Sequence, residues 1–288
     1  MLAPSIVQLR NGILARDGAY TCVVRAAISK SFEFSKHAWS LGKREEPFFL
    51  GATLRGVCED LIALAFLSKL STFDRNEAVQ SLVGMNAEEG ASAQSAFFSI
   101  VRPWQPVLTV SPERFSATEQ RLRALASKLG WQGRRPWPSV RSMATSVELK
   151  PLYDYMYAVS SKWVHFSPQM LMRTGWSKDA GPVSDATEWT FTVAHFRRYY
   201  TDFVQVYSTY LLLLELQRLA PTIPEFVPPN TEKLSEKLHS ILRWPEATTY
   251  EEMNIKPPHP LRLLLGMLAH GADPTEKRKT RLSAKSSN

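Results

Sequence analysis

The segment FFLGATLRGVCEDLIALAFLSKL, residues 48–70, constrains the fold more than any other part of the sequence. Its apolar residues recur with helical spacing, but they surround almost the whole helix instead of forming one stripe. Such a helix is stable in water only when other helices cover it. The segment therefore predicts a central, buried helix, and a chain of 288 residues is long enough to build a core around it.

Helical periodicity extends through most of the chain, whereas no segment alternates clearly as a strand does. Besides the central helix, we expect helices at about 20–41, 86–101, 112–129, 151–168, 185–219, 232–242 and 261–269. This pattern predicts an all-α protein. We expect a single multi-helix bundle over residues 1–220, a small C-terminal helical appendage over 221–270 and a disordered basic tail over 271–288.

The charge balance narrows the classes of partner. The 35 Lys and Arg residues exceed the 27 Asp and Glu residues, which gives a net charge of +8 and indicates nucleic acid first and an anionic membrane surface second. Cys22 and Cys58 lie in apolar helical patterns without metal-ligand spacing, so we interpret them as buried side chains in a reducing compartment. No apolar run reaches the roughly 20 residues of a membrane span, and we see no signal peptide. We therefore expect a cytoplasmic protein.

Common catalytic motifs are absent from the sequence. It contains no phosphate-binding loop, no glycine-rich dinucleotide motif, no H-E-x-x-H and no G-x-S-x-G. The six histidines are scattered, and none is spaced with a second ligand so as to hold a metal. We therefore expect neither a cofactor nor a metal site.

Arg55 and Glu59 form the charged pair of the central helix. They are four residues apart, so they share a face and can form an ion pair. Charges on so apolar a helix are costly to bury unless they are paired. One interpretation is a structural clamp, in which Arg55 bonds Glu59 and carbonyl groups of neighbouring helices. The other is an anion site, in which Arg55 binds a phosphate and Glu59 orients it.

A second polar pattern lies in PLYDYMYAVSSKWVHFSP, residues 151–168, which begins and ends with a proline. Tyr153, Tyr157, Ser161 and His165 are spaced four apart and therefore lie on one side of a helix. They can form a buried network in which the side chains satisfy one another. Alternatively, His165 can act as an acid or base, with the Ser161 hydroxyl bonded to its ring. A nucleophilic Ser161 lacks a recognisable third group.

Two basic and aromatic segments indicate contacts with nucleic acid. In WQGRRPW, Arg134 and Arg135 lie between Trp131 and Trp137, in a loop that can contact phosphates and stack on bases. In HFRRYY, residues 195–200, similar side chains share the predicted long helix. The competing interpretations are a solvated surface loop and an ordinary packed helix.

Taken together, the two polar patterns resemble an uncharacterised bacterial family of helical proteins, catalogued as a domain of unknown function. The shared features are L-R-x-x-x-E, here LRGVCEDLIAL, followed by Y-x-x-x-Y-x-x-x-S-x-x-x-H, here YDYMYAVSSKWVH. Parts of this family look like the HEPN superfamily of helical bundles. Many HEPN proteins are metal-independent ribonucleases in toxin–antitoxin and phage-defence systems, and others have lost activity.

The resemblance implies an RNA-directed nuclease or toxin. Arg55 would stabilise the phosphate, His165 would act as acid or base, and Glu59, Ser161 and Tyr157 would support them. The closely spaced Arg and His pair of HEPN nucleases is absent here, so the two residues would have to converge from different helices. The alternative is a non-catalytic regulatory bundle whose polar stripes are structural and whose basic surfaces bind RNA or a partner protein. A third possibility is a small-molecule pocket between the central helices.

Overall fold

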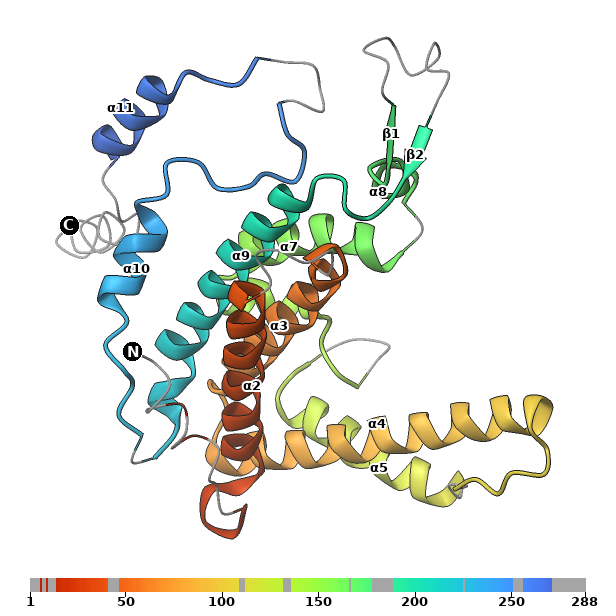
Figure 1. Cartoon of the computed structure of the whole chain (residues 1–288). Helices are drawn as coiled ribbons and strands as arrows, with labels where there is room; N and C mark the ends of the chain where they lie inside the picture. The colour runs from red at the N-terminus through yellow and green to blue at the C-terminus, as the bar shows by residue number, and fades with distance from the viewer. Residues whose placement is uncertain are drawn as a thin grey trace, which may run out of the picture.

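The computed structural model describes residues 6, 9, 14–40, 47–108, 112–131, 136–165, 167–177, 189–224, 226–250 and 256–270. In these ranges the helices are α2 (Leu14–Ser40), α3 (Pro47–Leu67), α4 (Thr72–Val101), α5 (Pro112–Lys128), α6 (Val140–Ser146), α7 (Lys150–Val164), α8 (Pro168–Met172), α9 (Arg197–Arg218), the 3-10 turn η2 (Ala220–Thr222), α10 (Glu232–His239) and α11 (Pro260–His270). Two short strands, β1 (Gly175–Ser177) and β2 (Trp189–Phe191), accompany them (Figure 1). The predicted all-α class is confirmed.

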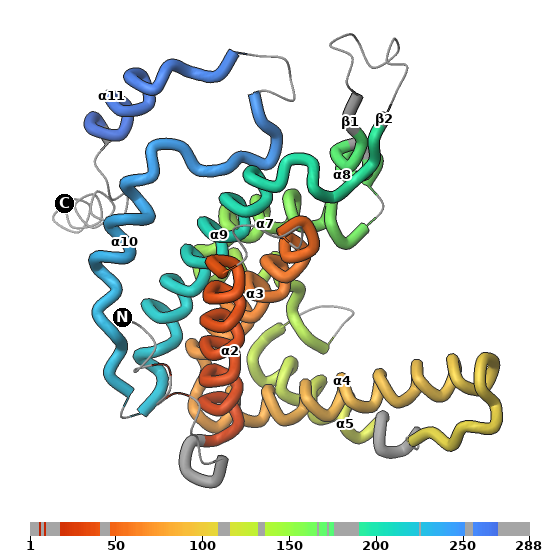
Figure 2. The backbone as a smooth tube through the Cα atoms, viewed as in Figure 1, coloured from red at the N-terminus to blue at the C-terminus, as the bar shows by residue number. Residues whose placement is uncertain are grey.

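Helix α3 is the buried centre of the bundle. It packs against α2, α6, α7 and α9, and Figures 1 and 2 show α2 and α9 running beside it. Its Leu54, Leu61 and Ile62 side chains have no exposed surface. The helix that is apolar on nearly all sides is thus covered by four others, which confirms the prediction made from its sequence.

Helix α7 approaches α3 very closely at Gly51. A Cβ atom at this position would lie 2.4 Å from Cε2 of Trp163, which is closer than real Cβ atoms come to other heavy atoms. The Trp163 ring also packs against Tyr200 and Phe203 of α9, with ring centroids 6.1 and 5.6 Å apart. The absence of a side chain at Gly51 therefore sets the distance between the two helices that carry the predicted polar patterns.

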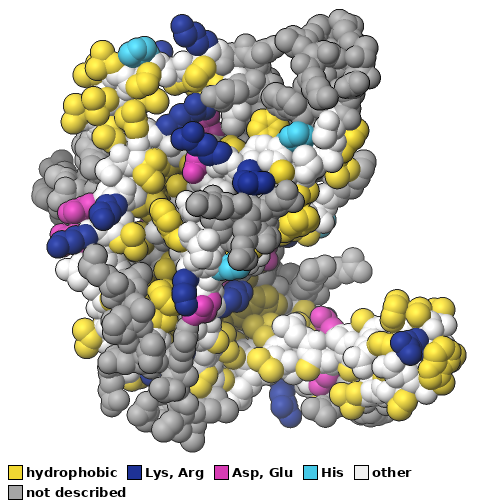
Figure 3. Space-filling view, viewed as in Figure 1, with side chains coloured by type: hydrophobic (Ala, Val, Ile, Leu, Met, Phe, Trp, Pro, Cys, Tyr) yellow, Lys and Arg dark blue, Asp and Glu magenta, His cyan; other side chains and the backbone are white. Residues whose placement is uncertain are grey.

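Helices α4 and α5 form a hairpin that projects from the bundle (Figure 2). Helix α4 begins at Thr72 because the Ser71 hydroxyl accepts a hydrogen bond from the Asp74 N–H at 3.1 Å. The predicted start near residue 86 was therefore too late by several turns. At the free end, Phe97, Ile100 and Trp104 are exposed, and Figure 3 shows hydrophobic side chains gathered there.

Both predicted ends of α5 are confirmed. The helix begins at Pro112, where the missing N–H costs nothing. After its last residue, Gly130 takes a left-handed conformation with φ of 67°, and the Trp131 N–H bonds the Ala126 carbonyl at 2.8 Å. This is the usual glycine-terminated helix end, in which free carbonyls of the last turn find donors.

The helix predicted over residues 185–219 was wrong in part of its N-terminal third. Residues 185–188 lie outside the described residues, whereas Trp189–Phe191 form β2, which pairs antiparallel with β1. Helix α9 begins only at Arg197, after Phe196 in a left-handed conformation with φ of 58°. Pairing with β1 holds this strand in place, and its Trp189, Thr190 and Phe191 are of residue types that suit a pleated ribbon.

The C-terminal part lies along α9. Leu238 of α10 is buried against Val206 and Leu213 of α9. The division of the chain at residue 220 stays a prediction, and the predicted tail, residues 271–288, lies outside the described residues. Across the ranges that the structure describes, no helix is both long and apolar enough to cross a membrane.

Candidate functional site

The two predicted polar patterns meet in the structure. Nη1 of Arg55, on α3, lies 3.3 Å from Nε2 of His165, at the end of α7. Arg55 also donates a hydrogen bond from Nε to Oε1 of Glu59 at 2.8 Å. Its guanidinium carbon lies 4.7 Å from the centre of the Tyr157 ring, within cation–π distance. The structure thus brings Arg55, Glu59, Tyr157 and His165 together in one cluster, which we call the Arg–His site.

His165 owes its position to the end of α7. The last helical residue is Val164, and His165 is already extended, with φ of −109° and ψ of 164°. Its N–H still bonds the Ser161 carbonyl at 2.8 Å. The following Ser167 precedes Pro168 and is also extended, as a residue before proline prefers. The proline predicted to stop this helix therefore acts through the residues before it.

The contact between Arg55 and His165 assigns the roles of the two nitrogens. A guanidinium has only donors, so Nε2 of His165 is the acceptor when this hydrogen bond forms. The site thus places an imidazole nitrogen next to a permanent cation.

Glu59 holds the guanidinium from the opposite side. Its hydrogen bond raises the pKa of Arg55, and its charge adds to that effect, so Arg55 stays cationic. Burial raises the pKa of the Tyr153 hydroxyl, and Glu59 raises it further, which keeps that hydroxyl protonated. The rings of Tyr153 and Tyr157 lie 5.6 Å apart. Glu59 and the two tyrosines therefore lie around the Arg55 guanidinium, and the Nη1 atom that faces His165 is not bonded to the carboxylate.

The Arg–His site is open to solvent. The Arg55 side chain is 25% exposed, the Glu59 side chain 31% and Tyr157 43%, and His165 is also exposed. A buried clamp would have shown these groups sealed by neighbouring helices. The exposed surface instead leaves room for an anionic group to contact Arg55, His165 and the Tyr157 ring from one side.

Ser161 does not join the cluster. Its hydroxyl is buried and has no hydrogen-bond partner among the described residues, so it does not bond the His165 ring. The reason is geometric: His165 leaves the helical path, whereas Ser161 remains inside α7 with its hydroxyl buried. The expectation of a side-chain bond between Ser161 and His165 was therefore wrong.

The tryptophans of the predicted nucleic-acid loop form an aromatic cluster with Phe66. The ring centroids of Trp131 and Trp137 are 5.2 Å apart, and each lies near Phe66, at 5.4 and 6.1 Å. Both tryptophans are half-buried in this packing. Arg134 and Arg135, the basic half of that prediction, lie outside the described residues.

The second predicted segment, residues 195–200, has mixed roles. Nε2 of His195 lies 3.0 Å from the Thr190 carbonyl, so the ring caps the β-ribbon. The Tyr199 hydroxyl donates to the Glu246 carbonyl at 2.6 Å, and Tyr200 is buried. These three side chains therefore support the fold.

The sequence match covers the Arg–His site. Residues 51–182 match DUF5677, a family of unknown function. The resemblance to an uncharacterised helical family, predicted from the two motifs, is confirmed. The DUF5677 segment contains Arg55, Glu59, Tyr157, Ser161 and His165, and it begins at Gly51, the point of contact with Trp163. No curated protein and no solved structure matches the chain significantly.

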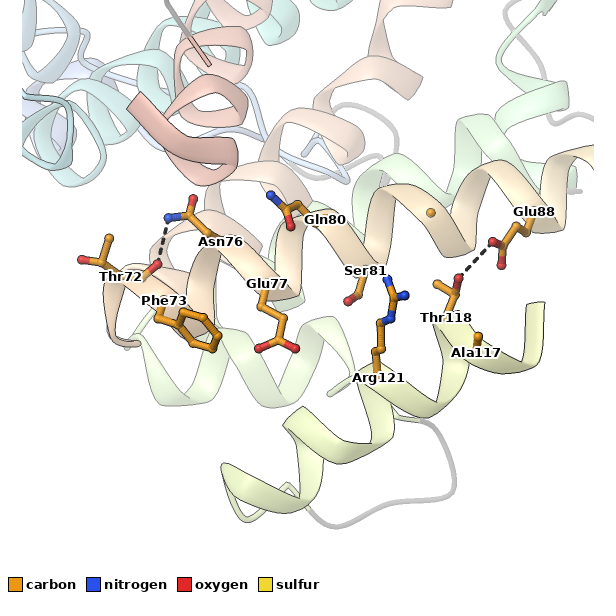
Figure 4. A pocket seen from close by; sticks show the side chains of 11 residues that line it. Thr72, Phe73, Asn76, Glu77, Gln80, Ser81, Glu88, Ala117, Thr118 and Arg121 are labelled. Atoms are coloured by element: carbon orange, nitrogen blue, oxygen red, sulfur yellow. Dashed lines mark hydrogen bonds between the residues drawn. The ribbon is translucent and has the colours of Figure 1, made fainter. Parts of the chain in front are cut away.

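Two features of the molecule escaped the sequence interpretation. Gly51 and Trp163 set the approach of α7 to α3, and the only signal was an isolated glycine inside a helical pattern, which often has a packing reason. The second feature is a polar groove of about 1130 Å³ between α4 and α5, shown in Figure 4. Thr118 donates there to Glu88 at 2.9 Å, and Asn76 donates to the Thr72 carbonyl. The groove lies on the projecting hairpin, apart from the Arg–His site.

The part of the chain that the structure describes contains no set of side chains arranged to bind a metal ion. In those residues, no three His, Cys, Asp or Glu side chains gather closely enough to hold an ion. The Arg–His site contains one carboxylate and one imidazole, and a guanidinium occupies the space between them. Its residues suit an anion better than a cation.

Proposed function

We propose that the chain is a metal-independent, RNA-directed nuclease, of the toxin-like kind found among HEPN bundles. The observation that carries this proposal is the 3.3 Å contact between Nη1 of Arg55 and Nε2 of His165 on an exposed surface. A permanent cation and a neutral imidazole are the two groups that cleavage of an RNA phosphodiester needs, one for charge and one for a proton.

The reaction that fits these groups is an internal transesterification. Arg55 turns from His165 to the phosphate, and the freed Nε2 of His165 takes the proton of the ribose 2′-hydroxyl. The 2′-oxygen forms a bond to phosphorus while the bond to the 5′-oxygen breaks. Water supplies the proton to the leaving 5′-oxygen. Arg55 binds the non-bridging oxygens as negative charge builds up on them. The products are a 2′,3′-cyclic phosphate and a 5′-hydroxyl end.

Glu59 and Tyr157 are positioning residues in this proposal. Glu59 fixes the Nε side of the guanidinium, so that the other nitrogens face His165 and the solvent. The Tyr157 ring supports one face of the guanidinium and leaves 43% of its own surface exposed, where a base can stack.

The test is cleavage of diverse RNAs by the purified chain, with and without EDTA. We expect cleavage that EDTA does not abolish, with 2′,3′-cyclic phosphate ends, and no cleavage of RNA that carries 2′-O-methyl groups. His165→Ala and Arg55→Ala should each lower the rate by roughly 100-fold or more. His37→Ala, which removes an exposed histidine of α2, should keep the wild-type rate. Equal inertness of wild type and both site variants would reject the proposal.

The second candidate function is a non-catalytic binding bundle. It is favoured by the number of contacts that Arg55 already makes, since Glu59, Tyr157 and His165 together tie α3 to α7. In that case, Arg55→Ala would lower the melting temperature and leave no activity to lose. The nuclease function therefore predicts that Arg55→Ala lowers the cleavage rate, whereas the binding function predicts that it lowers only the melting temperature.

A further inference from the structure

A second hollow lies away from the Arg–His site, between the first half of α9, the end of α2 and the segment that follows α10. Its volume is about 650 Å³, within the range of pockets that hold small molecules. Half of its lining side chains are aromatic or aliphatic, and five are charged. Figure 3 shows Lys and Arg side chains, with acidic ones between them, where the chain after α10 crosses above α9. We call this hollow the α9 cavity.

Two tryptophans form walls of the α9 cavity, and hydrogen bonds fix both. Trp39 is 57% exposed, yet its Nε1–H donates to Thr209 at 3.0 Å. Trp244 donates from Nε1 to the Leu238 carbonyl at 3.2 Å, and its ring packs against Tyr210 at 5.3 Å. A large aromatic surface that is both exposed and held in place is suited to stacking on a flat ligand.

Charged groups in the cavity divide into two sets. Arg243 donates to Glu246 at 2.8 Å, and Arg173 donates to the Ala247 carbonyl at 3.1 Å, so these two arginines already hold the fold together. Arg198 and Asp202 differ. They lie one turn apart on α9, but in the described structure neither takes part in a hydrogen bond or a close ion pair.

Arg198 and Asp202 present complementary polar groups at one wall. An ionised carboxylate only accepts hydrogen bonds, and a guanidinium only donates them. Partial burial raises the pKa of Asp202, and the charge of Arg198 lowers it in part. A ligand that offers two donors beside an acceptor on one edge would satisfy both groups, while its flat body fills the space against Trp39 and Trp244.

We propose that the α9 cavity binds a purine base with a guanine-type edge. The ring N–H and the exocyclic amino group of guanine would donate to Asp202, and its carbonyl oxygen would accept from Arg198. Adenine offers one donor on that edge, and cytosine has a smaller stacking surface. The α9 cavity is separate from the Arg–His site, so this inference does not depend on the proposed nuclease activity.

The test is calorimetric titration of the full chain with four nucleosides. We expect guanosine to bind, inosine, which lacks the exocyclic amino group, to bind roughly tenfold more weakly, and adenosine and cytidine to bind more weakly still. Equal affinities for all four nucleosides would show that Asp202 and Arg198 do not recognise the edge of the base. No binding of guanosine at millimolar concentration would reject the proposed binding site as a whole. RNA cleavage is not part of this readout, so either proposal can fail alone.

Variants locate the ligand. Asp202→Asn and Arg198→Gln should each weaken guanosine roughly tenfold or more, and Trp39→Ala should weaken all four nucleosides together. The matched control is Arg123→Gln on α5, which removes an equally charged side chain that is 51% exposed and lies on the projecting hairpin. All three exchanged side chains of the cavity are on the surface, so circular dichroism should show an unchanged fold. Guanosine affinity that survives both charge exchanges would place the ligand elsewhere.

Discussion

Nε2 of His165 accepts a hydrogen bond from Nη1 of Arg55 across 3.3 Å, although 110 positions separate the two residues in the chain. The contact depends on two local events. Helix α7 ends at Val164, so His165 can turn out of the helical path, and Gly51 lets α7 lie close against α3. The end of α7 and the missing side chain at Gly51 are features of the backbone, yet both determine whether the Arg55 and His165 side chains meet.

The exposure of the Arg–His site predicts a small stabilising contribution from its ion pair. Arg55→Ala and Glu59→Ala should each lower the free energy of unfolding by only about 1 kcal/mol, because the two side chains are 25% and 31% exposed. Urea unfolding followed by circular dichroism measures this. A loss of roughly 3–5 kcal/mol would instead mark a buried clamp and support the non-catalytic function.

The contact between Gly51 and Trp163 predicts a steric effect. Gly51→Ala should destabilise the protein by roughly 1–3 kcal/mol, because the new methyl group would overlap the indole ring. Gly56→Ala on the same helix is the matched control, since nothing lies within 4 Å of its Cβ position. That exchange should stabilise the protein by up to about 1 kcal/mol through helix propensity. Identical melting temperatures for the two variants would contradict the packing.

Glu215 predicts a dependence of stability on pH. Its side chain has no exposed surface, and burial raises its pKa from 4.5 to about 8, while the nearby Ser31 hydroxyl lowers it in part. Between these two values the folded chain holds one proton that the unfolded chain has released. Stability should therefore fall as the pH rises from about 4.5 to about 8 and level off above it, by an amount on the order of a few kcal/mol.

Glu215→Gln should remove this slope and raise the melting temperature at pH 8, because a neutral amide replaces a carboxyl that must otherwise ionise in the core. Glu236→Gln, on the exposed side of α10, should leave the slope as it is. Melting temperatures between pH 5 and pH 9 distinguish the variants. A slope that persists in Glu215→Gln would assign the titration to another group.

The two thiols should differ in reactivity. Cys58 is 1% exposed, and burial raises its pKa to about 12, with Glu59 and Glu215 adding to the effect. Cys22 is only half-buried. Iodoacetamide at pH 8 should therefore modify Cys22 in the native chain and Cys58 only in denaturant, because the thiolate is the reactive form. Mass spectrometry of the labelled peptides reads this directly, and modification of Cys58 in the native chain at the rate of Cys22 would disprove its burial.

Local signals in the sequence predicted those parts of the fold that local interactions determine. The central helix follows from an apolar pattern on all sides, and the ends of α5 follow from Pro112 and Gly130. Residues 189–191 were misassigned because their strand conformation depends on pairing with β1, a partner that the periodicity of a single segment does not reveal. The early start of α4 has a local signal, Ser71 three residues before Asp74, which the prediction from helical periodicity did not use.

In the candidate site, too, local contacts could be predicted from the sequence and tertiary contacts could not. The pairing of Arg55 with Glu59 follows from their spacing of four on one helix, and the structure forms it. The place of Ser161 could not be predicted from spacing alone, since an ideal helix continued through His165 would have kept both on one stripe. The meeting of Arg55 with His165 is a tertiary contact, and no property of either segment alone specifies it.

The projecting hairpin affects the diffusion of the molecule and its encounters with other molecules. Helix α4, with 30 residues, is about 45 Å long, and much of it projects from the bundle (Figure 2). The protein should therefore diffuse and tumble more slowly than a sphere of its mass. As it rotates, the exposed Phe97, Ile100 and Trp104 at the end of the hairpin travel far from the bundle and are placed to meet other molecules early.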